Sequence, residues 1–255
     1  MSHALLSTRP TARLPSRRIA YPLLDFLAPS ICTSGPRSRF HSSAPVDAQP
    51  AAQAHVAHAG KPGVRPLNDD QRDFLDSALR VNQAGELAAV LIYAAQTPPV
   101  VRSHPHLRPL MKHMYDQEAG HFKTFNALIA KHRVRPTLMY PVWKAAATAL
   151  GWGTAVMGRE AAMACTEAVE TEIGTHYNEQ VRVLLDWAEK TEKRGESMGE
   201  EMTALITELR RIRDEELEHL DHAVEHDAKE AKPYELLTNV IRGGCRTAIW
   251  ISERV

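Results

Sequence analysis

The fold of this chain is decided by the stretch Asp214–His219, which reads DEELEH. Within it, Glu216 and His219 are three residues apart, and residues at this spacing lie on one face of an α-helix. The same Glu-x-x-His spacing occurs at Glu118 and His121. Helical bundles that bind two metal ions use two such pairs, each on its own helix, and one glutamate from each of two further helices. The stretch therefore predicts a four-helix bundle, provided that the chain supplies two more glutamates.

Apolar residues recur at helical spacing along four long segments, which predicts four helices, each with one apolar stripe. These helices are expected over about 68–96, from Pro105 or Pro109 to just before Pro136, over about 159–190, and over about 202–229. Asn68 can cap the first helix, with Gln71 in the capping-box position. The pair Pro98-Pro99 is expected to end that helix, because proline lacks the backbone donor.

Each predicted stripe is interrupted either by one glutamate or by a glutamate and a histidine. A buried carboxylate is costly unless it is paired or bound to a metal ion. The candidate metal ligands are Glu86 on the first helix, Glu118 and His121 on the second, Glu170 on the third, and Glu216 and His219 on the fourth. Carboxylates and imidazoles suit iron or manganese, and Glu118 and Glu216 are the expected bridges between two ions. The alternative is a bundle whose glutamates form surface salt bridges.

Two details of this ligand set stay open in the sequence. Glu167 and Glu172 are rivals of Glu170, since Glu167 lies one turn before it and Glu172 lies roughly 160° away around the helix. Partner side chains are also expected to orient the two histidines. The acids close enough in sequence are Asp116, Asp214 and Glu215, and the pattern does not choose among them.

Three segments lie outside the four helices. Residues 138–157 are the least polar part of the chain and carry Trp143 and Trp152. They are either an interfacial segment with tryptophans at the headgroup level or a buried crossover between helices. Residues 190–201 are expected to form a solvated loop, and Pro233 is expected to open a fifth helix. The predicted fold class is all-α, a four-helix bundle with a hydrophobic crossover segment and an extra C-terminal helix.

The amino-terminal composition differs from the rest of the chain. Residues 1–46 contain six arginines, no lysine and a single acidic residue, Asp25. This composition is typical of an organelle transit peptide, so we predict a mitochondrial transit peptide over 1–40; a disordered basic tail is the alternative. Residues 41–66 are expected to be a flexible linker, and 67–255 the folded domain.

Composition also narrows the class of function. The formal net charge is zero, so the chain lacks the basic excess of a nucleic-acid-binding protein, and no such partner is expected. The three cysteines, Cys32, Cys165 and Cys245, are far apart in sequence. They have neither zinc-site nor disulfide spacing, which favours a reducing compartment.

Several motifs together resemble the 5-demethoxyubiquinone hydroxylase family of ubiquinone biosynthesis, and the resemblance covers the chain from about residue 66 to its end. The motifs are RVNQAGE at 80–86, DQEAGH at 116–121, AMACT at 162–166, AVE at 168–170, HYNEQ at 176–180, RDEELEH at 213–219, GCR at 244–246 and ISER at 251–254. Two features depart from the family pattern. Asn82-Gln83 stands where an Asp-His pair is expected, and the loop at 190–201 is longer than expected.

The resemblance implies a ferritin-like di-iron monooxygenase whose six metal positions are all matched here. Such an enzyme hydroxylates the ring of demethoxyubiquinone with O₂ and with electrons from NADH, and His176 and Tyr177 match a pair implicated in electron transfer. It implies a peripheral protein on the matrix side of the inner mitochondrial membrane. Its implied partners are a lipid-binding protein that presents the polyprenyl quinone substrate, and the biosynthetic complex; a homo-oligomer is left open.

Around the centre, Phe125, Met163 and Ile173 are expected to exclude water and to accept the ring. Two other enzyme classes, ferroxidases and manganese catalases, share the ligand scheme. A helical membrane scaffold without chemistry is an alternative of a different class. Metal content separates the scaffold from the enzymes, and hydroxylation of a demethoxyquinone analogue separates the hydroxylase from the ferroxidase.

Overall fold

The computed structural model describes residues 66–255, and over this part of the chain it is entirely helical apart from turns and loops. The helices are α1 (Asp69–Ser103), α2 (Arg108–His132), α3 (Tyr140–Met157), α4 (Arg159–Glu192), α5 (Gly199–Glu225) and α6 (Tyr234–Ser252). Two short 3-10 helices, η2 (Pro105–Leu107) and η3 (Ala228–Glu230), precede α2 and α6. The predicted transit peptide (1–40) and linker (41–66) lie outside the described residues, apart from Pro66.

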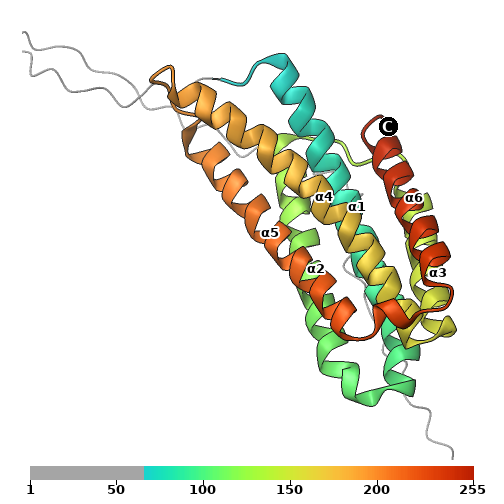
Figure 1. The fold of residues 1–255 in the computed structure, drawn as a ribbon. Coiled ribbons are helices and arrows are strands. Elements are labelled where there is room, and N and C mark those ends of the chain that lie inside the picture. Colours follow the sequence, from blue (N-terminus) through green and yellow to red (C-terminus); the bar gives the residue numbers. More distant parts are fainter. Residues whose placement is uncertain (1–65) are drawn as a thin grey trace, which may run out of the picture. The chain divides into compact units, whose positions relative to one another are not determined.

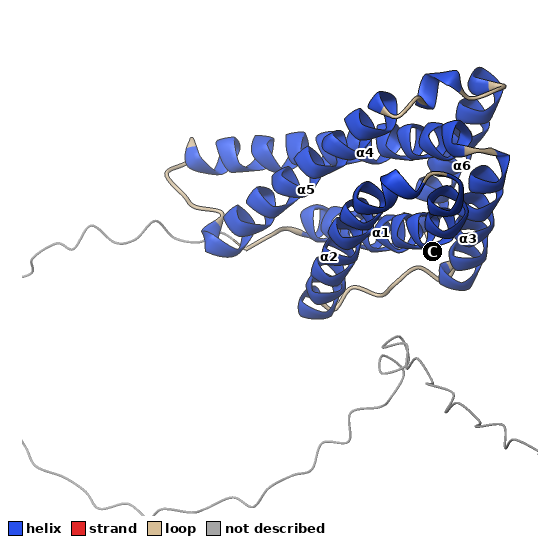
Figure 2. Cartoon of the chain, turned by 90° about the horizontal axis from the view of Figure 1, so that it is seen from below, coloured by secondary structure: helices blue, strands red, loops and turns tan. Residues whose placement is uncertain are grey.

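The helices form three layers of two. Helices α1 and α4 make the middle layer, α2 and α5 cover one side of it, and α3 and α6 cover the other (Figures 1 and 2). The four-helix bundle consists of α1, α2, α4 and α5, while α3 is the crossover between α2 and α4. This arrangement confirms the predicted all-α, ferritin-like bundle with a crossover segment and an extra C-terminal helix.

The predicted start of α1 is confirmed, and the predicted end is wrong. The Asn68 side chain accepts a hydrogen bond from the backbone N–H of Gln71 at 2.8 Å, and the Gln71 side chain accepts one from Asn68 N–H at 3.1 Å. The helix then continues through Pro98 and Pro99 to Ser103. It does so because the residues beyond the prolines, Val100 and Val101, are buried in the core, and such packing outweighs the lost backbone bonds.

Helix α3 packs one face on the bundle and leaves the other uncovered. Gly151 lies so close to α1 that a Cβ atom there would be 2.5 Å from the backbone oxygen of Ile92. The next residue, Trp152, is 59% exposed. The Trp143 indole N–H donates to Ser252 Oγ of α6 at 3.0 Å. The segment is therefore a packed crossover with an exposed apolar face, and contact with a bilayer stays a prediction.

Other boundaries shift by a few residues. Helices α4 and α5 extend into the predicted loop, so that only residues 193–198 separate them. Pro233 precedes α6 as its N-cap residue rather than standing at its first helical position. None of the described helices combines the length and the apolar character that crossing a membrane requires.

Candidate metal centre

The six predicted ligands meet in the middle of the four-helix bundle. Each has a relative exposure of 1% or less. The four helices contribute Glu86 from α1, Glu118 and His121 from α2, Glu170 from α4, and Glu216 and His219 from α5. Apolar residues lie on both sides of the ligands along each helix. On α2, Met114 lies before the ligands and Phe125 after them, and both are fully buried. The ligands therefore form a polar layer of the bundle between two apolar core clusters.

The ligand atoms fall into two groups of four. One group contains Glu86, Glu118, His121 and Glu216, and the other contains Glu118, Glu170, Glu216 and His219; within each, the ligand atoms lie within 4.8 Å of one another. Glu118 and Glu216 belong to both groups, which is the position that bridging carboxylates occupy in a two-metal centre. That these residues hold metal ions stays a prediction.

Unpartnered polar atoms show that the site suits a cation. Every one of the six residues has at least one buried side-chain oxygen or nitrogen without a hydrogen bond, including both carboxylate oxygens of Glu118 and of Glu216. Such atoms are rare in protein interiors because their desolvation is costly. A divalent iron or manganese ion would coordinate them, and the carboxylate charges would balance those of two ions.

The two histidines present the same atom to the centre. His121 Nδ1 lies 3.0 Å from a carboxylate oxygen of Glu216, and His219 Nδ1 lies 2.9 Å from one of Glu118. Each Nε2 faces outward to a partner: that of His121 is 2.6 Å from Glu215, and that of His219 is 2.9 Å from the Gln117 amide oxygen. Because the partners accept the Nε2 proton, Nδ1 is left free to bind a metal ion.

These contacts decide between the acids that the sequence left open. Glu215 holds a histidine, whereas Asp116 pairs with Lys112, and Asp214 pairs with Arg213. Sequence reasoning missed Gln117, since it considered only acids as partners of the histidines. The signal was present, because Gln117 directly precedes Glu118 on α2.

The three glutamates of α4 have different surroundings. Glu170 enters the centre, where its carboxylate accepts a hydrogen bond from the Tyr93 hydroxyl at 3.1 Å. Glu167 instead pairs with Lys229 and accepts a hydrogen bond from Tyr234. Glu172 pairs with two arginines of α6 (below). Of the three, Glu170 alone belongs to the buried ligand groups among the described residues.

Burial and mutual proximity shift the acid–base behaviour of the centre. Burial, assisted by the nearby charge of Glu216, raises the pKa of Glu86 to about 8. Burial alone would raise the pKa of Glu216, but the close imidazoles of His121 and His219 outweigh this effect and lower the pKa to about 2. Burial alone would lower the pKa of His219, but the close carboxylates of Glu118 and Glu216 raise it to about 9. Protons and a metal ion therefore compete for the same atoms, and metal binding would release protons.

An apolar cavity of about 370 Å³ lies beside the centre, between α1, α3, α4 and α6. Glu86 forms part of its wall, next to Tyr177 and His176. Ile173 also lines it, as expected for a residue that accepts a ring. Phe125 and Met163 pack in the core clusters and do not line this cavity. Their expected part in excluding water and accepting the ring stays a prediction.

His176 and Tyr177 differ in how they contact the centre. The Tyr177 hydroxyl donates a hydrogen bond to the Glu86 carboxylate. The His176 Nε2 atom is buried without a hydrogen-bond partner, and burial lowers the pKa of this imidazole, which favours its neutral form. Both line the cavity, and their part in electron transfer stays a prediction.

Asn82 and Gln83, which stand where the family pattern has an Asp-His pair, connect α1 to its neighbours. The side-chain amides of Asn82 and Gln180 exchange two hydrogen bonds of 2.8 Å, which join α1 to α4. The Gln83 amide donates to Asn126 of α2 at 3.1 Å. Glu86 keeps its place in the ligand group, so the departure leaves that ligand in place.

Comparison with known proteins agrees with this geometry. A family model described as the ubiquinone biosynthesis protein COQ7 matches residues 73–252. The chain belongs to this family. It is 50% identical over 203 residues to the mitochondrial 5-demethoxyubiquinone hydroxylase of Saccharomyces cerevisiae, over 78% of this chain and 87% of that protein.

More distant relatives have related names. The mitochondrial NADPH-dependent 3-demethoxyubiquinone 3-hydroxylase of Rattus norvegicus is 45% identical over 188 residues, which cover 74% of this chain and 81% of that protein. The 3-demethoxyubiquinol 3-hydroxylase of Rhodospirillum rubrum is 36% identical over 226 residues, which cover 87% of this chain and 100% of that protein. The resemblance seen in the motifs is thereby confirmed.

Proposed function

We propose that the chain is a di-iron monooxygenase that hydroxylates the ring of demethoxyubiquinone, in its quinol form, during ubiquinone biosynthesis. One observation carries the proposal: six buried ligands with unpartnered atoms meet an apolar cavity at Glu86. The names of the relatives support the reaction and the substrate class. The donor set of carboxylates and imidazoles supports iron.

The side chains of this site would act on the substrate in three ways. The apolar walls of the cavity, including Ile173 and Val169, bind the ring and exclude water from it. The Tyr177 hydroxyl holds a proton against Glu86, which lines the cavity. His176 is neutral and can accept a hydrogen bond from a quinol hydroxyl, because its buried Nε2 has no other partner. Two iron ions, when bound by the six ligands, would supply the activation of O₂.

The electrons are proposed to come from a reduced nicotinamide. The sequence resemblance implies NADH, whereas the names of several relatives specify NADPH. A direct comparison decides between them: the rate of hydroxylation is measured with NADH and with NADPH under otherwise equal conditions. A higher kcat/KM with NADPH would overturn the assignment of NADH as the electron donor. It would not affect the proposal that the chain is a hydroxylase.

We also place the chain at the matrix side of the inner mitochondrial membrane as a peripheral protein. The relatives named above are mitochondrial in two of three cases, and the polyprenyl tail of the substrate partitions into lipid. Helices α3 and α6 expose large apolar side chains, among them Trp152, Val240 and Trp250, as expected for an interfacial surface.

A flotation assay with liposomes tests this surface. Trp152→Glu is expected to weaken liposome binding, because Trp152 projects from the uncovered face of α3. Val224→Glu is the control, since Val224 is also exposed but belongs to α5 in the opposite layer. Equal binding of both variants and the wild type would remove the membrane surface from the proposal.

A lipid-binding partner protein, together with the biosynthetic complex, is proposed to deliver the polyprenyl quinone. The support is chemical: a long apolar tail needs a covered path between bilayer and cavity, and the apolar face of α3 and α6 lies beside the cavity. Turnover of a long-tailed substrate in liposomes should rise when the partner is added, whereas turnover of a short-tailed analogue should not.

Anaerobic reconstitution with Fe²⁺ followed by an assay tests the central proposal. We expect about two irons per chain and hydroxylation of a short-tailed demethoxyubiquinol analogue in the presence of O₂ and reduced nicotinamide. Iron oxidation without hydroxylation would favour a ferroxidase, and peroxide breakdown after Mn²⁺ loading would favour a manganese catalase. Failure to bind any metal would favour the scaffold alternative.

A further inference from the structure

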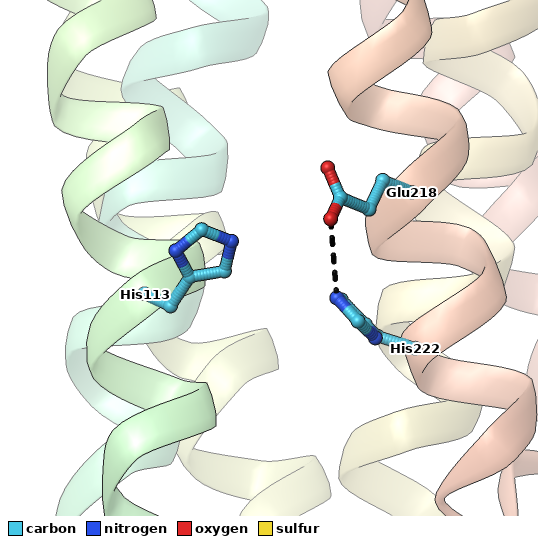
Figure 3. Close-up of side chains that lie close together, drawn as sticks. All are labelled: His113, Glu218 and His222. Atoms are coloured by element: carbon cyan, nitrogen blue, oxygen red, sulfur yellow. Dashed lines mark ion pairs between the residues drawn. The ribbon is translucent and has the colours of Figure 1, made fainter.

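A second cluster of metal-binding side chains lies on the surface, between α2 and α5. It consists of His113 of α2 and of Glu218 and His222 of α5 (Figure 3). The His113 ring points from α2 toward the side on which the other two side chains lie. Their ligand atoms all lie within 4.8 Å of one another, the same spacing that defines the two buried groups.

The geometry suits coordination of one ion. His222 Nε2 is 3.6 Å from a Glu218 oxygen, and two ligands of a tetrahedral zinc ion are about 3.3 Å apart. The rings of His113 and His222 have centroids 6.4 Å apart and are nearly perpendicular. Small rotations of these exposed side chains would bring all three atoms onto one ion, and water would fill the remaining position.

A second carboxylate supports one of the ligands. Glu225 lies 3.6 Å from His222 Nδ1, the ring nitrogen that does not face Glu218. A carboxylate behind the non-ligating nitrogen is the arrangement that orients metal-binding histidines. The nearest cation in sequence, Lys112, is held by Asp116.

This cluster is separate from the buried centre but belongs to the same two helices. His222 lies one turn after His219, and His113 lies one turn before Gln117, which accepts the hydrogen bond of His219. The buried residues are at most 1% exposed, whereas the side chains of His222 and Glu218 are 27% and 51% exposed. An ion could therefore reach the surface cluster without opening the bundle.

We propose that His113, Glu218 and His222 form an exchangeable surface site for one divalent transition-metal ion such as Zn²⁺. Imidazole and carboxylate ligands suit this class of ion, and three protein ligands leave one position for water. A bound ion would bridge α2 and α5 next to His219. The site requires neither the hydroxylase activity nor iron in the buried centre.

Titration of the iron-loaded protein with Zn²⁺ under anaerobic conditions tests the site. Calorimetry should detect about one Zn²⁺ per chain, while elemental analysis shows that the iron content is unchanged. Addition of Zn²⁺ should also raise the melting temperature, because a ligand that binds only the folded state stabilises it. Zinc uptake matched by iron release, or no zinc uptake, would overturn the proposal.

Single variants then assign the ligands. His113→Gln and His222→Gln should each weaken zinc binding by at least the roughly 10- to 100-fold that loss of a supporting partner costs. Both should abolish the zinc-dependent rise in melting temperature. His106→Gln is the control, because His106 is exposed but lies outside the cluster. Wild-type zinc affinity in both ligand variants would refute the assignment, whatever the outcome of the hydroxylase assay.

Discussion

The metal centre and the cavity beside it share Glu86 but are built from opposite kinds of side chain. The centre gathers buried carboxylates and imidazoles, each with at least one polar atom that lacks a hydrogen-bond partner. The cavity is lined mainly by apolar residues such as Ile92, Leu150 and Val169. Each arrangement costs stability in the absence of a ligand, in the centre through desolvated polar atoms and in the cavity through lost dispersion contacts. The difference indicates two ligands of opposite chemistry that meet at one carboxylate.

The largest expected effect comes from Glu170→Gln in the centre. The variant should hold about one metal ion or fewer instead of about two, and hydroxylation should fall by roughly 100-fold or more. Burial, with the charge of Glu216, holds the pKa of Glu170 well above its ordinary value. Removing this unfavourable charge should therefore leave the metal-free variant at least as stable as the wild type. Metal analysis and denaturant unfolding measure the two effects.

Glu167→Gln is the matched control on the same helix. Glu167 contacts Lys229 and Tyr234 rather than the centre, so this variant should keep its full metal content. Metal loss in Glu167→Gln and not in Glu170→Gln would mean that Glu167, rather than Glu170, is the metal ligand of α4.

The next effect is on the cavity, through Ala248→Trp on α6. Ala248 lines the cavity, and an indole there would occupy the space of the ring at a cost of about 1–3 kcal/mol, or roughly 5- to 150-fold in KM. Metal content should not change. Thr247→Trp is the control, since Thr247 is exposed and does not line the cavity. If KM rises equally in both variants, or if Ala248→Trp loses metal, the two regions are not separable.

A smaller effect is expected where α3 packs against α1. Gly151→Ala places a methyl group against the backbone of Ile92, and the forced separation of α3 from α1 should cost about 1–3 kcal/mol of unfolding free energy. Gly153→Ala, on the same helix, meets nothing within 4 Å and should stabilise the protein by about 0.5–1 kcal/mol. Chemical denaturation of the pair checks the opposite signs.

The sequence predicted the centre better than the cavity, for a physical reason. Polar residues on an apolar stripe are visible as exceptions to the 3.6-residue period, so Glu86 and Glu118 could be placed before the structure was known. A cavity has no such signature, because its walls come from four helices whose packing the sequence does not specify. Phe125 and Ile173 were equivalent as stripe residues, but only Ile173 lines the cavity.

The errors in the helix boundaries have the same origin. Local chemistry gave the start of α1 correctly, because the capping box involves only Asn68 and Gln71. It gave the end wrongly, because burial of Val100 depends on residues far away in the chain, such as Met163 and Ala223. The sequence placed Glu170 in the ligand set but could not exclude Glu172, since the arginines that hold Glu172 are on α6.

Substitution of Glu172 is expected to have the smallest effect on the protein. This residue contrasts with the centre because its charge is balanced by side chains of the chain itself. It too is a buried carboxylate, but the chain supplies its cations: Arg242 Nε lies 2.6 Å and Arg246 Nε 2.7 Å from its oxygens. Burial acts upward on its pKa, but the bonds to the arginines outweigh it and hold the pKa below the ordinary value of 4.5. Its contribution to stability is therefore complete well above pH 4.5 and is lost as the pH falls through the lowered pKa.

Glu172→Gln should accordingly lower the unfolding free energy by about 1 kcal/mol at neutral pH, a value kept small by the exposure of both arginines. The difference between wild type and variant should shrink toward zero in acid, because the wild-type carboxylate becomes protonated there. Denaturant unfolding from pH 7 downward measures this difference. A difference that stays constant with pH would mean that the charge of Glu172 is not what joins α4 to α6.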